Sequence, residues 1–567
     1  MTSTFPRGGL DQALSRFGRQ AGVPVSVNAA MAAGLASPGV RGRHTASQAL
    51  RLLLAGTGLQ GVRDASGEYT LRKLPDGASS GIDVATLTAI TITGAALGAA
   101  TEGTDSYAAR AVTIGKTTQT LREIPQSVSV ITRRQMEDQN LTSVADALAR
   151  STGVINPPQT SISPGASQAR GFQLVNRQFD GVPFPMYGYT PPDTAIYDRI
   201  EVLRGAAGLL QGTGDPSGVV NLVRKRPGKE FAASAAASLG SWNNYRGELD
   251  VGAPLNASGT VRGRAVATWQ DRDNYVDNQD VRQLLGYGII EADLTPDTLL
   301  TFGAVSGYTK GTGIYQFGLP RGSDGSDLGV SRRRSFDPPW AKSDDSGTQF
   351  FASLEQRLGG DWKAKLSYQQ EDGSSQVKRF MLLGPIDPAT GGGAGLLQRA
   401  WDWDRTNRGA DFNVSGSQTL WGREHRFLLG VNWQQDKSSN NDISAPRLDV
   451  DDFFTFDPTQ VPEPDWSSYA TNEVTDRTDQ LGLYGSAHLK LADPLTLILG
   501  GRLSWWKNQG GLRNLSTGVA SIRPDNEIRS EFTPYAGVVY DLNGAWSVYA
   551  SYADIFKPQT NALRRAN

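Results

Sequence analysis

The sequence predicts two α/β domains followed by an antiparallel β-barrel that crosses a membrane. Residues 1–74 mix helical and strand periodicity, and residues 112–230 combine β-branched strands with helix-capping sequences. From residue 231 onward apolar and polar residues alternate with a period of two. A chain of 567 residues is also too long for one core, so several domains are expected.

The first domain is predicted to contain two longer helices, a short helix at residues 28–34 and three strands. Residues 9–21 form a helix whose apolar residues recur on one face, namely Leu10, Ala13, Leu14, Phe17 and Ala21. A second helix is expected at residues 45–55, and strands are expected at residues 23–27, 59–63 and 68–74. The unit contains no residue pattern that suggests chemistry.

A linker is predicted at residues 75–111, because this stretch is rich in Gly, Ala, Ser and Thr and lacks helical periodicity. Residues 85–93 within it alternate as a strand does, with no partner strand nearby. An unpaired strand on a tether is suited to adding itself to the edge of another protein's sheet. Pairing back onto its own domain is the alternative, which stays open.

The second domain begins with strand and helix signals. Residues 124–131 alternate as a strand, and Thr132 and Ser143 each open a sequence that fits a helix-capping box. Each box places an acceptor side chain before an apolar helical stretch. We therefore expect one helix after each of these two residues.

Residues 199–223 read as a strand, a glycine turn, one apolar helical turn and a second strand. The spacing of Gly212, Gly214 and Gly218 approaches that of a phosphate-binding loop. Such a loop must open a helix, so that the helix N-terminus meets the anion, whereas here a strand follows. These glycines are therefore expected to serve close packing.

The last 337 residues, 231–567, carry the alternation of barrel strands. One strand face consists of Trp362, Ala364, Leu366 and Tyr368, and the opposite face consists of Lys363, Lys365, Ser367 and Gln369. Residues 535–542 and 546–552 alternate in the same way. Apolar outside and polar inside is the pattern of a lipid-facing barrel, although a soluble sandwich also alternates.

The lengths of the connections favour the barrel. Tight turns are predicted at residues 295–297, 359–360, 492–494 and 543–544. Long polar stretches lie between them at residues 310–346, 372–404, 437–477 and 508–528. Short turns at one end and long loops at the other are typical of outer-membrane barrels.

The composition argues against several other kinds of protein. The net charge is −1, with 56 basic and 57 acidic residues, so nothing indicates nucleic-acid binding. There is no cysteine and there are three histidines, far apart in the sequence, which leaves no clear metal site or catalytic triad. We expect no catalytic residue, no metal ligand and no cofactor, and hence no enzyme. No apolar run suits a transmembrane helix, and the first residues lack the apolar core of a secretory signal.

Four ordered motifs carry a family resemblance. They are Ile124-Pro125-Gln126-Ser127-Val128, Ala169-Arg170-Gly171-Phe172, Asp180-Gly181-Val182-Pro183 and Glu201-Val202-Leu203-Arg204-Gly205. Together they resemble the plug domain of TonB-dependent siderophore receptors, although Ala206 stands where the family usually has proline. The stretches Leu10-Asp11-Gln12-Ala13-Leu14 and 53–59 resemble the short N-terminal signalling domain of secretins and some of these receptors.

The resemblance implies four parts: a signalling domain at 1–74, a linker with a TonB box at 75–111, a plug at 112–230 and a partial transmembrane barrel at 231–567. The box that binds TonB would consist of Leu87, Thr88, Ala89, Ile90, Thr91 and Ile92. The structural residues of the plug motifs would be Arg170, Gly171, Asp180, Gly181, Glu201, Arg204, Gly205, Gly212, Gly214 and Gly218.

An aromatic, proline-stiffened loop follows the Asp-Gly-Val-Pro motif and is the candidate for ligand binding. Rigid aromatic faces bind at small entropic cost, and a nearby arginine suits an anionic chelate. The candidate residues are Arg177, Phe184, Met186, Tyr187 and Tyr189. Burial against the barrel wall, and a structural ion pair for the arginine, are the alternatives.

The alternation accounts for about 13 strands, whereas plugged barrels of this kind need about 22. We therefore expect an incomplete barrel and a chain truncated at both ends, lacking the signal peptide and the final third of the barrel. An inert fragment whose barrel cannot close is accordingly one alternative for its function.

By resemblance, the chain is an outer-membrane receptor for TonB-dependent uptake of a ferric siderophore, with a periplasmic N-terminal domain. Its expected partners are the TonB complex, an anti-sigma regulator, the ferric siderophore and outer-membrane lipid, and not nucleic acid. Iron would arrive chelated by the siderophore, so no cofactor is expected. Uptake of another substrate, such as cobalamin, another metal chelate or a glycan, stays open.

Overall fold

The computed structural model describes residues 98–156, 167–184, 193–313, 319–469 and 471–558, together with short stretches between residues 2 and 73. The chain divides into two compact units, Met1–Ala95 and Ala96–Asn567. Across the described residues, no helix combines the length and the apolar character needed to cross a membrane.

The first unit is a small α/β domain. Its strands are β1 (Thr2–Phe5), β2 (Gly8–Gly9), β3 (Val25–Ser26), β4 (Ala36–Ser37), β5 (Val40–Arg43), β6 (Leu59–Arg63) and β7 (Tyr69–Lys73), and its described helix is α3 (Ala46–Leu54). The strands pair as β1 with β5, β2 with β4, and β3 with β7 and β6. The predicted apolar face is confirmed for Leu10, Ala13, Leu14 and Phe17, which are buried with residues of α3. Ala21 lies outside the described residues.

A five-stranded sheet forms the centre of the second domain, residues 98–224, which we call the plug. Its strands are β8 (Ser127–Thr132), β12 (Asn176–Phe179), β13 (Val182–Phe184), β14 (Tyr197–Arg204) and β15 (Gly218–Arg224). They lie in the order β13-β12-β15-β14-β8, with β12 and β15 parallel and the other pairs antiparallel. Strand β8 is therefore an edge of this sheet.

Short elements surround the plug sheet. They are η1 (Leu121–Glu123), α4 (Arg133–Asp138), α5 (Val144–Ala149), β9 (Val154–Ile155), β10 (Gln168–Ala169), β11 (Phe172–Gln173), η2 (Thr194–Ile196) and α6 (Gly208–Gln211). The predicted caps are confirmed, since the Thr132 side chain accepts from the Gln135 amide and Ser143 accepts from the Asp146 amide. One apolar core joins α4, α5, β9, β10 and η2 to the sheet and to inward-facing wall residues such as Tyr287, whereas Leu210 of α6 lies in a second core with Leu203 and Val219.

Two of the family motifs are tight hairpin turns. Arg170 and Gly171 have φ angles of 56° and 82°, and Asp180 and Gly181 have φ angles of 52° and 81°. Each pair connects strands whose flanking residues are directly opposite each other. Positive φ at both central residues characterises the type I′ turn, for which Asp-Gly is a preferred sequence.

The glycines of residues 199–223 allow close approach of backbone and side chains. A Cβ at Gly218 would lie 2.2 Å from the Leu203 carbonyl oxygen, and one at Gly214 would lie 2.2 Å from Asn176 Oδ1. A Cβ at Gly212 would meet Gln480 and Arg502 of the barrel strands. Strand β15, not a helix, follows Gly218. This stretch therefore lacks the helix N-terminus that a phosphate loop requires.

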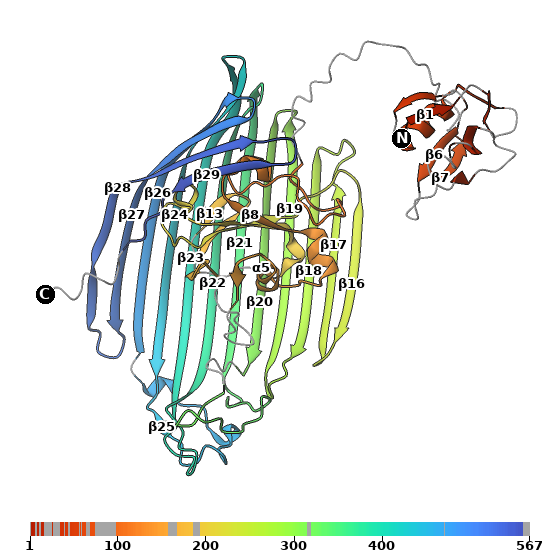
Figure 1. The fold of residues 1–567 in the computed structure, drawn as a ribbon. Helices are drawn as coiled ribbons and strands as arrows, with labels where there is room; N and C mark the ends of the chain where they lie inside the picture. The colour runs from red at the N-terminus through yellow and green to blue at the C-terminus, as the bar shows by residue number, and fades with distance from the viewer. Residues whose placement is uncertain are drawn as a thin grey trace. The chain divides into compact units, whose positions relative to one another are not determined.

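The remaining strands form one large antiparallel sheet, which we call the wall and which curves around the plug (Figure 1). They are β16 (Ala232–Gly240), β17 (Asn244–Pro254), β18 (Val261–Asp273), β19 (Asp280–Thr295), β20 (Thr298–Thr312), β21 (Lys342–Gly359), β22 (Trp362–Leu383), β23 (Gly395–Leu420), β24 (Arg423–Ser444), β25 (Leu448–Asp449), β26 (Thr471–Ala492), β27 (Leu495–Asn514), β28 (Ala520–Asp541) and β29 (Ser547–Ala553). Of these 14 strands, 13 follow one another in chain order and β25 lies off that path beside β23. The predicted antiparallel sheet and its approximate strand number are confirmed.

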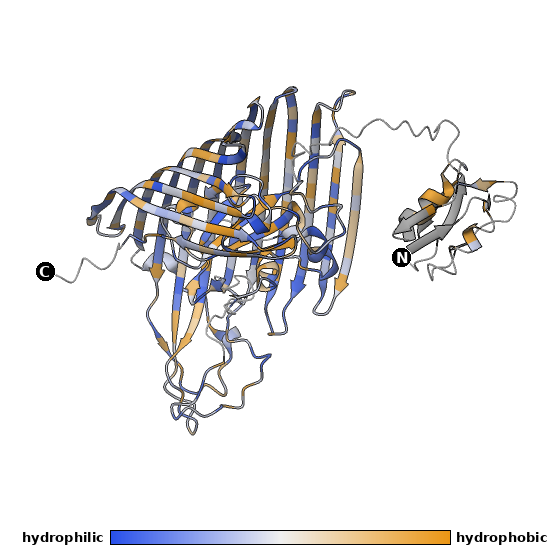
Figure 2. Cartoon of the chain, turned by 45° about the horizontal axis from the view of Figure 1, so that its top comes forward, coloured by the Kyte–Doolittle hydropathy of each residue, from blue (hydrophilic) through white to orange (hydrophobic). Residues whose placement is uncertain are grey.

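The wall strands alternate as the sequence predicts (Figure 2). On β22, Leu366 and Tyr368 are exposed, whereas Ser367 and Gln369 are buried against the plug. On β28, Val538 and Tyr540 are exposed and Val539 is buried. The outer face is thus apolar and the inner face polar, which is the arrangement of a strand that faces lipid on one side.

The connections differ at the two ends of the wall as predicted, but the expected loops were too long. The long connections are residues 313–341, 384–394 and 445–470, whereas residues 515–519 at the same end are a five-residue turn; each of the four is shorter than the polar stretch read from the sequence. Strands β22 and β23 stay paired as far as Leu383 and Gly395. Alternation marks only the part of a strand that faces lipid, so the polar ends of these strands read as loops.

Three of these connections share an apolar core at the long-loop end, which lies at the bottom of Figure 1. Phe336 stacks on Phe453 with ring centroids 5.3 Å apart, and Trp340 lies edge-on to Phe380 at 6.0 Å. The Arg334 side chain donates to the Phe453 carbonyl at 3.0 Å. The three connections therefore pack as one body.

Replacing Gly218 with Ala should lower the stability of the plug by about 1–3 kcal/mol, because the new Cβ would collide with backbone at a φ of 145°. Thermal unfolding of the purified protein, followed by circular dichroism, measures this. Gly247→Ala is the control, since a Cβ there meets nothing within 4 Å. Equal unfolding midpoints for the two variants would contradict the packing role of Gly218.

Candidate functional site

The first described segment of the plug, residues 98–118, is called the strap below. It follows the predicted TonB-binding strand Leu87–Ile92 after residues 93–97, and that strand lies outside the described residues. Where it is described, the strap adds no strand to the five-stranded plug sheet, and Val112 forms a single bridge with Gln119. Val112 and Ile114 pack against Leu203 and Val219 of that sheet. The strap is therefore attached mainly by side chains.

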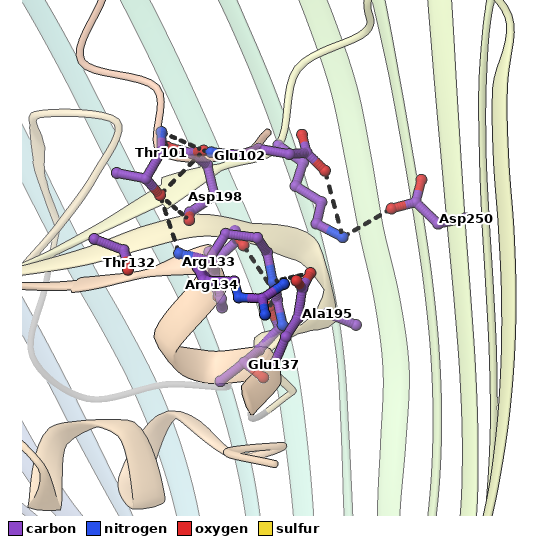
Figure 3. Close-up of polar contacts among 12 residues, drawn as sticks. Thr101, Glu102, Thr132, Arg133, Arg134, Glu137, Ala195, Asp198 and Asp250 are labelled. Carbon is purple, nitrogen blue, oxygen red and sulfur yellow. Dashed lines mark hydrogen bonds and ion pairs between the residues drawn. The ribbon is translucent and has the colours of Figure 1, made fainter. Parts of the chain in front are cut away.

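The first attachment of the strap is to Asp198 at the start of β14 (Figure 3). The Asp198 carboxylate accepts from the Thr101 amide at 2.9 Å and from the Glu102 amide at 2.7 Å. The Thr101 hydroxyl donates to the Asp198 carbonyl at 2.8 Å and accepts from the Arg133 amide at 3.0 Å. One buried carboxylate thus fixes two consecutive residues of the strap.

Glu102 also connects the strap to the wall. Its carboxylate accepts from both terminal nitrogens of Arg264, at 2.6 and 2.5 Å. Arg264 in turn contacts Asp250 at 2.7 Å, and Asp250 also contacts Lys225 at 2.8 Å. This chain of charges joins the strap, the end of the plug and strands β17 and β18.

The second attachment is to Glu201, a residue of the Glu-Val-Leu-Arg-Gly motif. The fully buried Glu201 carboxylate accepts from the Thr113 amide at 2.9 Å and from Arg199 Nε at 2.7 Å. Arg199 also donates to Asp198 at 2.7 Å and to the Thr113 hydroxyl at 3.0 Å. Burial disfavours the charge on Arg199, but Glu201 and Asp198 outweigh it and raise the pKa of Arg199.

The third attachment is a buried ion pair between the strap and the wall. Lys116 Nζ lies 2.6 Å from Asp411 of β23, and the two side chains are 2% and 3% exposed. Tyr484 donates its hydroxyl to Asp411 at 3.0 Å, and Asn413 donates to it at 2.7 Å. Burial lowers the pKa of the Lys116 ammonium, and Asp411 acts in the opposite direction. Asp411 is therefore a buried anion whose countercharge comes from the plug.

A further contact between plug and wall centres on Arg224, the last residue of β15. It pairs with Asp180 of the type I′ turn and donates to Gln349 at 2.7 Å and Gln369 at 3.2 Å on the wall. Burial would raise the pKa of Asp180, but the arginines beside it hold that pKa below its usual value. Asp180 thus joins a plug turn to the polar inner face of the wall.

A cavity of about 440 Å³ lies between the strap, the plug sheet and the wall. Its basic lining residues are Lys116, Arg199, Arg224, Arg226, Lys363 and Lys365, and its acidic ones are Glu102, Asp180, Asp198 and Glu355. A space of this polarity suits water better than an apolar ligand. Separation of the strap from the wall would therefore expose surfaces that water can solvate.

The residues predicted to bind ligand lie partly outside the described chain, since Met186, Tyr187 and Tyr189 fall in the undescribed stretch 185–192. Arg177 and Phe184 are buried, on β12 and β13 of the plug sheet. Arg177 lies 3.6 Å from Glu371 of β22, and its guanidinium stacks 5.5 Å from the ring of Phe184. Their assignment to a ligand stays a prediction.

Sequence reasoning missed two inward-facing tryptophans. Trp401 and Trp403 share the face of β23 that carries Asp411. Arg379 lies 4.4 Å from the ring centre of Trp401, and Arg405 lies 4.8 Å from that of Trp403. Both fall in a stretch read as loop, although the alternation Trp401-Asp402-Trp403-Asp404 indicates a strand.

The strap attachments were missed as well. Thr101, Lys116, Arg264 and Asp411 belong to no motif, and no local pattern marks them. Only Glu201 was singled out, and as a structural residue of its motif.

Replacing Lys116 with Met should lower the free energy of unfolding by about 3–5 kcal/mol, because Asp411 would remain as a buried unpaired charge. Chemical unfolding of the purified protein, followed by tryptophan fluorescence, measures this. In the double variant Lys116→Met/Asp411→Asn the loss should be smaller, since neither charge then remains.

Lys310→Met is the matched control. It removes an ion pair to Asp344 of 2.8 Å whose side chains are 53% and 37% exposed, and it should cost less than about 1 kcal/mol. A loss for Lys116→Met no larger than that of this control would contradict the importance of the buried pair.

Comparisons with known families cover most of the chain. Residues 286–567 match the TonB dependent receptor-like beta-barrel, residues 120–219 match the TonB-dependent receptor plug domain, and residues 23–74 match the secretin and TonB N-terminus short domain. The matches follow the order of the signalling domain, plug and barrel predicted from the sequence. The exact boundaries between the domains stay predictions.

Individual proteins resemble the chain over nearly its full length. The ferric-pyoverdine M114 receptor PbuA of Pseudomonas sp. (strain M114) is 35% identical over 98% of this chain and 68% of the relative. The ferripyoverdine receptor of Pseudomonas aeruginosa is 34% identical over 99% of this chain and 68% of the relative. The solved structure of the outer-membrane ferripyoverdine receptor of P. aeruginosa bound to ferripyoverdine gives a TM-score of 0.74 at 30% identity, over 98% of this chain and 71% of that one. The chain therefore belongs to the family of TonB-dependent siderophore receptors.

Proposed function

We propose that this protein is an outer-membrane receptor that imports a ferric siderophore of the pyoverdine class and reports its capture through the N-terminal domain. The observation that carries the proposal is the pattern of identities. Four ferric-pyoverdine receptors are 34% or 35% identical over 98% or 99% of this chain. A ferrioxamine B receptor is 24% identical over 78% of it. The family consists of receptors and transporters of the outer membrane.

The inner face of the wall offers groups that suit such a ligand. Trp401 and Trp403 provide aromatic surfaces, and Arg379 and Arg405 beside them provide positive charge for an anionic chelate. These residues lie toward the long-loop end of β22 and β23, and Arg177 of the plug lies deeper. Iron is the cargo here and is held by the siderophore. The receptor then needs only to recognise the chelate, and its resident chemistry needs no cofactor.

Import requires the plug to move. In this proposal the strap transmits the pulling force to the plug. TonB would pair with residues 87–92 by strand addition and pull toward the periplasm, where the N-terminal domain and the short-turn end of the wall would lie. The attachments at Asp198, Glu201 and Asp411 would release in turn. A ligand bound at the long-loop end would shift the equilibrium between the attached and the released plug only if it bound one of these two arrangements more tightly than the other.

Signalling is proposed from the N-terminal α/β unit. It matches the short domain shared by secretins and TonB-dependent proteins, and its proposed partner is a periplasmic segment of an anti-sigma regulator. A chelate of a metal other than iron is the second candidate substrate, since metal-pseudopaline receptors are 25% identical over 79% of this chain.

Ferric pyoverdine should bind the receptor in outer-membrane vesicles with saturable retention of radioactive iron on filters. Trp403→Ala should weaken the binding roughly tenfold, corresponding to about 1.4 kcal/mol of lost aromatic contact. Trp421→Ala is the control, because this side chain is 87% exposed in a short turn and should leave the affinity unchanged.

Ferrioxamine B, cobalamin and a metal-pseudopaline chelate serve as competitors in the same assay. Ferric pyoverdine alone should displace the label. Saturable binding of one of these competitors, with none of ferric pyoverdine, would overturn the proposed substrate class.

A further inference from the structure

The five residues Gln119–Glu123, called the rim turn below, attach the plug to three separate wall strands. Gln119 lies 3.3 Å from His488 of β26 through their side-chain nitrogens. Glu123 forms an ion pair with Arg426 of β24. Arg122 binds the connection between β28 and β29. No function proposed above uses these contacts.

Arg122 binds that connection through four hydrogen bonds. Its Nε donates to Asp541 at 2.8 Å, one terminal nitrogen donates to the Gly544 carbonyl at 2.8 Å, and the other donates to the Asn543 and Trp546 carbonyls. A planar guanidinium with several fixed donors matches such an array, whereas an ammonium does not.

The turn that binds Arg122, residues 543–546, is stabilised by hydrogen bonds of its own. The Asn543 side chain accepts from the amides of Ala545 at 2.8 Å and Trp546 at 2.9 Å, which closes the turn independently of the plug. A variant at position 122 should therefore leave the shape of this wall turn unchanged. This separates loss of the contact from loss of the fold.

The rim turn is itself stiff. Thr120 and Glu123 form a capping box around η1, in which the Glu123 carboxylate accepts from the Thr120 amide at 2.8 Å. Glu123 therefore both closes the turn and pairs with Arg426. The three wall contacts are thus held on one short rigid element.

The order of attachments along the chain determines how they share a load. The strap contacts at Thr101, Thr113 and Lys116 are spaced along the chain, so traction from the N-terminal side loads them one after another. The contacts of Gln119, Arg122 and Glu123 are loaded together. Exposed ion pairs contribute little singly, but contacts that must break at once resist a force jointly.

The element behind the rim turn is vulnerable to the same force. Strand β8 begins at Ser127 and is the edge of the plug sheet, paired on one side with β14. Traction on the N-terminal end of β8 would open its ladder one residue pair at a time, starting from Ser127 and Arg204. The Arg204 side chain donates to the hydroxyls of Ser127 and Ser129, at 2.6 and 2.7 Å, and so supports only the first pairs of this ladder.

We propose that the rim turn is a mechanical stop, with Arg122 as its principal contact, which confines a pull on the N-terminal side to the strap and shields β8. The idea rests on the proposed function in assuming traction through residues 87–92. The stop leaves the plug sheet fixed to the short-turn end of the wall while residues 98–118 separate from it.

Single-molecule pulling on the receptor in a lipid bilayer tests the stop without TonB and without a siderophore. The chain has no cysteine, so Gly98→Cys supplies one specific handle, and a Cβ there meets nothing within 4 Å. The first plug extension should be about 70 Å of contour length, the extended length of the strap. In Arg122→Met it should grow to about 120 Å or more, because β8 is released in the same step.

Arg134→Met is the matched control, since Arg134 is a half-exposed arginine of α4 paired with Asp138 inside the plug. The Arg134→Met variant should show a first extension of the same length as the unsubstituted receptor. Asp541→Asn should raise the fraction of long first extensions less than Arg122→Met does, because the three carbonyl contacts remain.

An Arg122→Met receptor that keeps the parent's first extension, or a parent whose first step already exceeds about 120 Å, would overturn the stop. The unfolding midpoints of the variants, measured by circular dichroism, should lie within a few degrees of the parent's, because exposed ion pairs contribute little to stability. Failure to bind ferric pyoverdine would overturn the proposed substrate and would leave this test unaffected.

Discussion

The polar inner face of the wall is the constraint on which the rest of the structure depends. Strands that expose Leu366 and Tyr368 on one side must place Ser367 and Gln369 on the other, because strand residues alternate. Buried polar groups are costly unless they have partners. The plug supplies those partners, as when Arg224 donates to Gln349 and Gln369.

This requirement explains why charges join the plug to the wall, beside the apolar contacts that wall residues such as Tyr287 and Phe351 make with the plug core. Lys116 balances Asp411, Lys225 balances Asp250, and Arg226 balances Glu291. An interface of this kind can separate when water replaces each partner, whereas a wide apolar interface would expose surface that water solvates poorly. The charged part of this interface therefore follows from the same alternation that suits the wall to lipid.

The sequence predicts the parts of this fold that depend on neighbouring residues. Period-two alternation identified the faces of β22 and β28, and side-chain caps identified the starts of α4 and α5. Asp180 and Gly181, predicted as part of a family motif, form a two-residue turn in which few other residues tolerate positive φ at both positions. Each of these features is decided within a few residues of chain.

Contacts between distant residues were not predictable in the same way. Lys116 and Asp411 are 295 positions apart, and neither lies in a pattern that distinguishes it from other charged residues. The far ends of β22 and β23 were also missed, because residues 372–376 have no apolar face and the alternation at 401–404 is short. Trp401 and Trp403 lie in that region, so the candidate ligand surface was read as a loop.

The length of these strands has a consequence for how the receptor can change. Strand β23 has 26 residues. At about 3.4 Å per residue and a tilt of about 45° it rises roughly 60 Å, while the apolar band of an outer-membrane barrel is about 25 Å tall. A large part of the strand pairing of β23 therefore lies beyond the apolar band, where neither lipid nor the plug restricts the choice of side chain. Substitutions there can change the surface at the long-loop end while the membrane-embedded portion keeps its sequence, so this surface and the lipid-facing band can vary independently.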